Sequence, residues 1–223
     1  MSFLKIHFIY WFAGLALLLP RIPVIGKWFN IINTAIHELG HALMALILEG
    51  SVKKIELFND ATGTATTSTK TKFGSILVAL AGYPFASLVS YFIFYLLSVG
   101  YNKGFLLGIS ILFLFMLIFW IRNIYGAIWV IAFCALNGYL IHINNEKYIQ
   151  IVTLLYAVFI AVDALYSALT VLFLSIFQKN NVSDATLLKK STGIPAFIWG
   201  LLFAGFSGYV FYCIVLFAHL AMK

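Results

Sequence analysis

Long apolar runs separated by short polar segments dominate the chain. An α-helix needs roughly 20 apolar residues to cross a bilayer, and most of these runs approach that length. The run from 105 to 143 is too long for one span, and Arg122-Asn123 divides it in two. We therefore expect six to seven transmembrane helices, at 4–20, 30–49, 73–99, 105–121, 124–143, 149–177 and 193–220.

Two polar segments interrupt this pattern. Residues 51–58 alternate between apolar and polar side chains, Asn59-Asp60 is a turn signal, and residues 61–68 are rich in threonine. This pattern predicts a β-hairpin within 51–72, directly after the second span, and the alternative is a plain polar loop. The segment 178–191 carries lysines and an aspartate and is predicted to be a polar loop.

Composition agrees with a membrane protein. Of the 223 residues, 63% are hydrophobic and 9% are charged, and the mean hydropathy is +1.03. Soluble domains have about 45–50% apolar and about 25% charged residues. We expect an all-α polytopic membrane protein with a single integral-membrane domain over 1–223. The net charge of +7 fits lysines that flank membrane spans and does not indicate a nucleic-acid partner.

The distribution of basic residues predicts the orientation in the membrane. With seven spans, nine Lys and Arg residues fall on the side of the N-terminus, the hairpin and the 178–191 segment, and five fall on the other side. Because basic residues favour the cytoplasmic side, we expect the hairpin to be cytoplasmic.

The second span carries a candidate metal site. His37-Glu38-Leu39-Gly40-His41 places two histidines four residues apart, on one face of a helix. Two such imidazoles can hold a zinc ion, and Glu38 is placed to take a proton from a water molecule that the metal activates. The alternative is a helix with two unrelated histidines, but ionisable groups in an apolar run are costly unless they pair or bind something.

A catalytic zinc site needs a third protein ligand. Of the seven acidic residues, only Glu38 and Asp163 lie well inside predicted spans. Counting 1.5 Å per residue from the span ends puts His37 and His41 roughly 12–18 Å deep and Asp163 roughly 21 Å deep. We therefore expect Asp163 to be the third ligand and keep Asp184 as the alternative. The competing roles are a hydrogen bond to another helix for Asp163 and helix capping for Asp184.

The motif resembles a known family. Ile36-His37-Glu38-Leu39-Gly40-His41-Ala42, the following Gly50 and the β-like segment ending in Gly63-Thr64 resemble the site-2 protease family of intramembrane zinc metallopeptidases. The segment 183–188 and Thr192-Gly193-Ile194-Pro195 are similar to its small bacterial members, which lack a PDZ or CBS domain.

This resemblance implies a zinc ion bound by His37, His41 and a distant aspartate, carried over to Asp163, with Glu38 as the base. The family's usual aspartate precedes glycine, whereas the order here is Val162-Asp163-Ala164 and the chain has no Asp-Gly pair.

Together these features predict a zinc-dependent intramembrane endopeptidase in a bacterial plasma membrane, whose partners are the lipid bilayer and the membrane segment of a protein substrate. The hairpin would offer a strand edge to an unwound substrate. Asn123 could be an oxyanion donor, although a surface turn explains it equally well. The alternative function is an inactive family member that binds or chaperones membrane proteins.

Overall fold

The computed structural model describes residues 25–178 and 182–220. The predicted first span, 4–20, lies outside these residues. The elements are α2 (Ile25–Ile47), β1 (Ser51–Leu57), β2 (Gly63–Ser68), α3 (Lys72–Ser98), α4 (Asn102–Phe119), α5 (Ile124–Ile143), α6 (Glu146–Phe177), α7 (Asp184–Thr192) and α8 (Ala196–Leu220).

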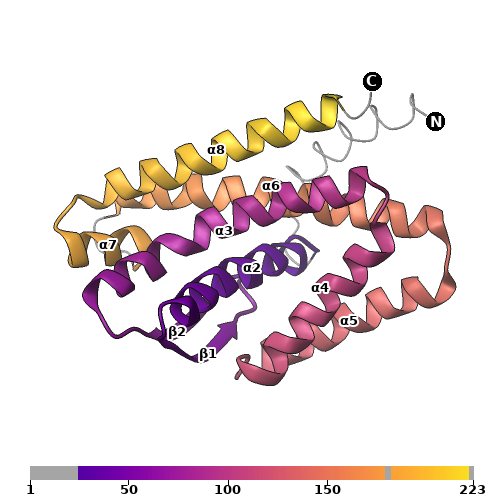
Figure 1. The fold of residues 1–223 in the computed structure, drawn as a ribbon, viewed down its shortest axis with the longest axis horizontal. Coiled ribbons are helices and arrows are strands. Elements are labelled where there is room, and N and C mark those ends of the chain that lie inside the picture. The colour runs from indigo at the N-terminus through magenta and orange to yellow at the C-terminus, as the bar shows by residue number, and fades with distance from the viewer. Residues whose placement is uncertain (1–24, 179–181, 221–223) are drawn as a thin grey trace.

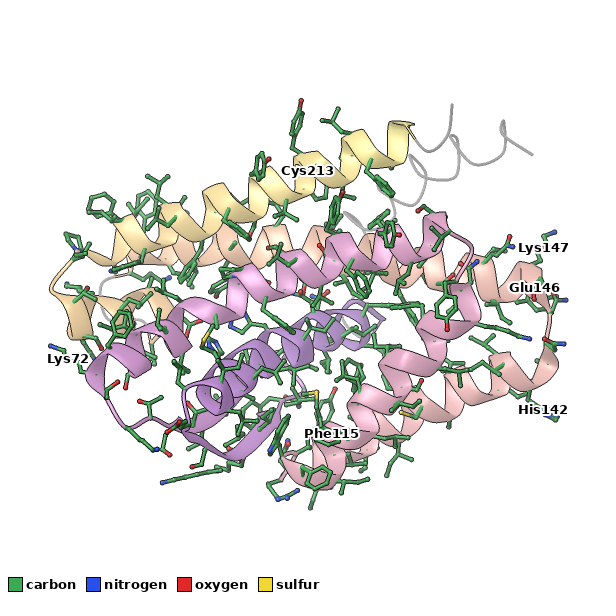
Figure 2. All side chains as sticks on the ribbon, viewed as in Figure 1. Lys72, Phe115, His142, Glu146, Lys147 and Cys213 are labelled. Atoms are coloured by element: carbon green, nitrogen blue, oxygen red, sulfur yellow. The ribbon has the colours of Figure 1, made fainter. Side chains whose placement is uncertain are left out.

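The protein is an all-α polytopic membrane protein with a small hairpin after the motif helix, as predicted. Among the described residues, five helices are long and apolar enough to cross a membrane: α3, α4, α5, α6 and α8. Charged groups lie at the ends of this bundle: Figure 2 shows His142, Glu146 and Lys147 at one end and Lys72 at the opposite end. The helix α2 is long enough to span but is less apolar, because it carries the polar residues of the motif.

The helices pack in two groups (Figure 1). The long helices α3, α6 and α8 lie side by side, and α2 packs against α3 and α6. The hairpin covers α2, and the short helix α7 packs on α3 and α8. The helices α4 and α5 form an antiparallel pair at the other side of the molecule. The motif helix is therefore enclosed by the hairpin and two of the longest helices.

Aromatic rings join α2 to the neighbouring helices. Phe29 of α2 stacks on Phe159 of α6 with ring centroids 4.4 Å apart. Trp28 lies against Trp129 of α5, and Trp129 stacks on Phe133 at 5.2 Å. Offset and tilted arrangements such as these are the preferred geometries of aromatic pairs. They fix the position of the N-terminal half of α2, and with it the position of the motif.

The predicted hairpin is confirmed. The strands β1 and β2 are antiparallel, with Ser51 opposite Ser68 and Leu57 opposite Gly63. The predicted break at Arg122 is also confirmed, because α4 ends at Phe119 and α5 begins at Ile124. Ile121, at this break, forms a bridge with Ile55 of β1. The connection between α4 and α5 therefore lies beside the hairpin.

Two predicted boundaries were wrong. The helix α2 begins at Ile25, whereas the span was expected to begin at residue 30. The segment 178–191 is not a plain loop, because α7 occupies Asp184–Thr192. Its first turn is closed by Ser183 and Thr186: the Ser183 N–H donates to Thr186 Oγ1 at 2.9 Å, and Thr186 Oγ1 donates to Ser183 O. This capping arrangement makes so short a helix favourable.

Gly40, inside the motif, lets α2 and α3 approach closely. A Cβ atom at this position would lie 2.8 Å from Phe85 Cβ and 3.2 Å from Ala81 O, both on α3. In contrast, a Cβ atom at Gly108 of α4 meets nothing within 4 Å. The glycine between the two histidines is thus a packing requirement, while Gly108 is not.

We expect Gly40→Ala to lower the thermal unfolding temperature, because overpacking of such a contact costs about 1–3 kcal/mol. Gly108→Ala is the matched control and should leave the temperature unchanged or raise it, since alanine favours helix by about 1 kcal/mol. Thermal unfolding of both variants in detergent measures this difference. Equal temperatures for the two variants would contradict the packing account.

Candidate metal centre

The side chains of the two motif histidines point toward each other. His37 and His41 lie one turn apart on α2, and their Nε2 atoms are 3.0 Å apart. Their rings meet edge to face with centroids 4.7 Å apart. His41 is only 8% exposed, and the His37 side chain is 15% exposed. Two imidazole nitrogens that face each other at this separation could both bind one ion.

The backbone of α3 fixes the orientation of His41. His41 Nδ1 lies 2.7 Å from the carbonyl oxygen of Val78. A carbonyl oxygen accepts only, so Nδ1 carries the hydrogen and donates. When the ring is neutral, its lone pair then lies at Nε2, which faces His37. Such a hydrogen bond on the outer nitrogen is typical of histidines that bind metals.

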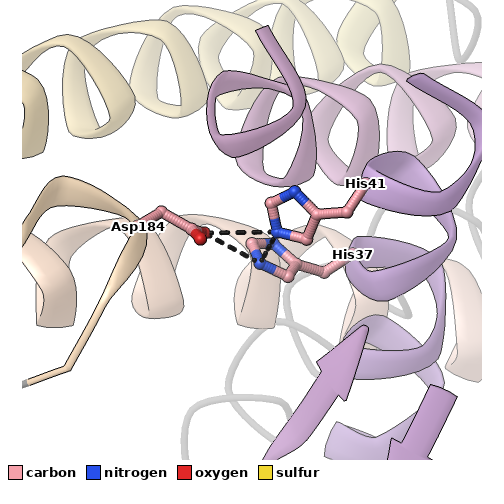
Figure 3. Close-up of side chains that lie close together, drawn as sticks. All are labelled: His37, His41 and Asp184. Carbon is pink, nitrogen blue, oxygen red and sulfur yellow. Dashed lines mark hydrogen bonds and ion pairs between the residues drawn. The ribbon is translucent and has the colours of Figure 1, made fainter. Parts of the chain in front are cut away.

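Asp184 completes the group. Its Oδ2 lies 3.2 Å from His37 Nε2 and 3.3 Å from His41 Nε2. Figure 3 shows the carboxylate of α7 pointing at the two imidazoles of α2. Zinc–nitrogen and zinc–oxygen bonds of about 2.0–2.2 Å at tetrahedral angles separate neighbouring ligand atoms by about 3.3–3.5 Å. The three atoms lie 3.0–3.3 Å apart, slightly closer together than the ligand atoms on one face of such a zinc site, and could hold one ion.

The two histidines favour the ionised form of the Asp184 carboxyl. Burial by itself raises the pKa of the Asp184 carboxyl, but the neighbouring His41 and His37 offset this and hold the pKa below its usual range. Asp184 is thus an ionised carboxylate beside two imidazoles. This donor set, two nitrogens and one carboxylate oxygen, is one that catalytic zinc accepts.

Apolar contacts hold α7 in this position. Ala185 and Leu188 of α7 are fully buried and belong to a small core with Phe203 of α8. Tyr83 and Leu80 of α3 pack against the same core. Ala185 is therefore anchored between α3 and α8. This contact brings the neighbouring Asp184, which lies outside the long apolar helices, to the histidines.

Asp163, the expected third ligand, does not lie with the histidines, whereas Asp184, which was kept as the alternative, does. Asp163 is 6% exposed and accepts a hydrogen bond from Asn33 Nδ2 at 3.0 Å. Asn33 lies one turn before His37 on α2, so Asp163 contacts α2 one helical turn away from the histidines. The depth estimate was too coarse to separate positions one helical turn apart, and it ignored the path of the segment between α6 and α8. Asp163 instead links α6 to α2.

Glu38 lies beneath the hairpin. It is 6% exposed. A Cβ atom at Gly63 of β2 would lie 3.0 Å from Glu38 Cγ and 3.2 Å from Glu38 Oε1. Thr34, one turn earlier, donates from Oγ1 to the Ala61 carbonyl at 2.8 Å. The strand β2 thus passes directly over the glutamate of the motif.

The sequence analysis did not identify Gly82 and Tyr83 as parts of this site. A Cβ atom at Gly82 would come within 2.6 Å of the Nε2 atoms of both His37 and His41, so only glycine leaves room for the imidazoles. Tyr83 packs edge to face on His37, with centroids 4.5 Å apart. The signal was Gly82-Tyr83-Pro84 within an apolar span, because a glycine inside a helix often marks a close approach.

Asn123 is not aimed at the histidines. Its amide bonds both backbone groups of Leu57, with Oδ1 accepting from the Leu57 N–H at 3.1 Å and Nδ2 donating to the Leu57 carbonyl at 2.5 Å. The suggested oxyanion donor is therefore engaged with the hairpin.

A polytopic helical membrane protein with two helical histidines, a converging carboxylate and a neighbouring glutamate has the architecture of an intramembrane metallopeptidase. The family model described as "Peptidase M50B-like" matches residues 8–214. The chain therefore belongs to this peptidase family, the family of the site-2 proteases. No curated protein and no solved structure matches the chain.

We expect metal content to separate the two candidate aspartates. His37→Ala and Asp184→Ala each remove a donor atom and should lower zinc affinity at least about 100-fold, more than the loss of an outer hydrogen bond usually does. Asp163→Asn keeps a polar partner for Asn33 and should retain one zinc per chain. Metal analysis of the purified variants measures this. Loss of zinc from Asp163→Asn together with retention in Asp184→Ala would contradict the assignment.

Proposed function

We propose that this protein is a zinc-dependent intramembrane endopeptidase that hydrolyses peptide bonds of a membrane-embedded protein substrate. The observation that carries the proposal is the convergence of His37, His41 and Asp184 beside Glu38, under a strand of the hairpin. The family membership supports peptidase chemistry. Its bacterial members, which the chain resembles, make a bacterial plasma membrane the proposed location.

The residues have distinct proposed roles. His37, His41 and Asp184 would hold the zinc ion, which supplies the Lewis acidity that activates water and polarises the scissile carbonyl. Glu38 would accept the proton of the attacking water and return it to the leaving amine, as a general base and then a general acid. The burial of Glu38 keeps this proton transfer away from bulk water.

The hydrogen bonds of β1 indicate which backbone groups of β2 are open. The Ile55 N–H donates to the Trp120 carbonyl at 2.7 Å, and the Ile55 carbonyl accepts from the Arg122 N–H at 3.1 Å. Both groups of Ile55 thus point away from β2. In an antiparallel pair, opposite residues either exchange both bonds or point both groups outward. Ala65, which lies opposite Ile55, therefore directs its N–H and carbonyl to the outer edge of β2.

The same argument applies at the turn end of the hairpin. Both backbone groups of Leu57 are bonded by Asn123, so Gly63 opposite Leu57 also points outward. Among the described residues, no strand pairs with this edge of β2. Gly63 packs on Glu38, so this edge would lie beside the proposed site of proton transfer.

This edge suits the substrate that the membrane supplies. A transmembrane helix hides its backbone in internal hydrogen bonds, so the segment must unwind before its peptide bonds can be attacked. An unwound segment needs new partners for its N–H and carbonyl groups, and a strand edge provides them. We propose that the substrate pairs with β2 at Gly63 and Ala65, beside Glu38.

Glu38→Gln tests catalysis against the alternative of an inactive binding protein. The amide cannot accept the proton, so we expect cleavage of a membrane substrate to fall about 10²- to 10⁴-fold. Zinc content should stay unchanged, since Glu38 is not among the three converging groups. The control is Glu49→Gln, which changes an exposed carboxylate that pairs with Lys70, and this variant should cleave normally. Full function of Glu38→Gln in cells would favour the binding role.

Ala65→Pro tests the strand edge. Proline removes the outward N–H of Ala65 without removing a bond between β1 and β2, so substrate pairing should weaken. We expect cleavage to fall about tenfold, the effect of roughly 1.4 kcal/mol, with zinc content retained. Thr66→Ala, which trims an exposed side chain on the same strand, is the control. A shortened 51–68 hairpin should have a larger effect, and unchanged cleavage by both hairpin variants would refute the pairing.

A further inference from the structure

The connection between α4 and α5 extends the hairpin by a third row of backbone. Ile55 of β1 is bonded on its outer side by Trp120 and Arg122, and Leu57 is bonded by the Asn123 side chain. The strand β1 is therefore the middle row, with residues 120–123 on one side and β2 on the other. The position of β2 depends on how this connection holds β1.

The Asn123 amide forms the second part of this link. Its Oδ1 accepts from the Leu57 N–H and its Nδ2 donates to the Leu57 carbonyl. Leu57 is fully buried. Without Asn123, both of these Leu57 groups would lack the partner that this structure gives them, and buried backbone groups need one. The two bonds join segments 66 residues apart in the sequence.

Asn123 does not perform the usual role of its position. It is the N-cap residue of α5, where an asparagine side chain normally accepts a hydrogen bond from its own helix. Here the side chain makes no such bond and reaches to Leu57 instead. A Cβ atom at Gly126, in the first turn of α5, would lie 2.7 Å from Asn123 Oδ1. The glycine thus leaves room for the amide in this orientation.

A short series of contacts connects Asn123 to Glu38. Asn123 holds Leu57, Leu57 lies opposite Gly63, and Gly63 packs on Glu38. On the other side of Gly63, Thr34 of α2 bonds the turn at Ala61. The end of the hairpin is therefore fixed at two points, one on α2 and one on α5.

We propose that Asn123 is a positioning residue that sets the register of β2 against Glu38, so that the outer edge at Gly63 and Ala65 receives the substrate strand. This inference rests on the proposed function. Asn123 acts through the hairpin and touches neither the converging donors nor the substrate. Its loss should weaken substrate binding while the metal group, which α2 and α7 form, stays intact.

The test compares Asn123→Ala with Asn145→Ala in the full-length protein in lipid nanodiscs. Asn145 also bonds two backbone groups, the N–H groups of Lys147 and Tyr148, but at the far α5–α6 connection. For Asn123→Ala we expect faster hydrogen–deuterium exchange at 63–68, and a KM for a membrane substrate raised about five- to tenfold, as expected for a lost hydrogen bond. The kcat should stay within about twofold and zinc content at one per chain.

Asn123→Asp is the second variant. It keeps an acceptor for the Leu57 N–H but sets a carboxylate oxygen against the Leu57 carbonyl, which repels it, so its KM and exchange should rise at least as far as those of Asn123→Ala. Asn145→Ala should leave exchange at 63–68 and KM as in wild type.

Two results would overturn the inference. One is exchange at 63–68 that is the same in Asn123→Ala and Asn145→Ala. The other is loss of zinc from Asn123→Ala, which would make the residue a general structural support. If wild type cleaves no membrane substrate, the proposed function fails, and the exchange comparison alone decides whether Asn123 positions β2.

Discussion

Polar groups inside an apolar helical protein need partners, and this requirement organises the whole structure. Lipid offers no hydrogen bonds, so histidines and carboxylates at membrane depth must meet each other, a backbone group or a metal ion. His41 meets Val78 through one nitrogen and the His37 and Asp184 side chains through the other. Asp163 meets Asn33. The packing of the helices thus gives His41, Asp184 and Asp163 a polar partner each.

Close backbone approaches make these meetings possible. At Gly82 the backbone of α3 lies against both imidazoles, and at Gly63 the backbone of β2 lies against Glu38. Gly40 allows α2 and α3 to touch between the two histidines. Each of these positions excludes a side chain, because the neighbouring group occupies its space. The centre is therefore bounded by main chain on two sides.

The hairpin connects this centre to the outside of the bundle. One of its strands is held by the α4–α5 connection, while the other leaves an edge beside Glu38. Gly63 and Ala65 are half-buried positions of β2, and their small size leaves the edge free of bulky side chains. Substrate pairing, proton transfer and metal binding would then occur within a single layer between α2, β2 and α7.

The sequence by itself determined the features that local pattern controls. Apolar run length predicted the spans and the division at Arg122, alternation with a threonine-rich run predicted the hairpin, and i, i+4 spacing placed His37 and His41 on one face. The third carboxylate depended on tertiary structure. Sequence depth favoured Asp163, but α7 folds inward on Ala185 and Leu188 and delivers Asp184. That path follows from packing between residues distant in the chain, which no local periodicity records.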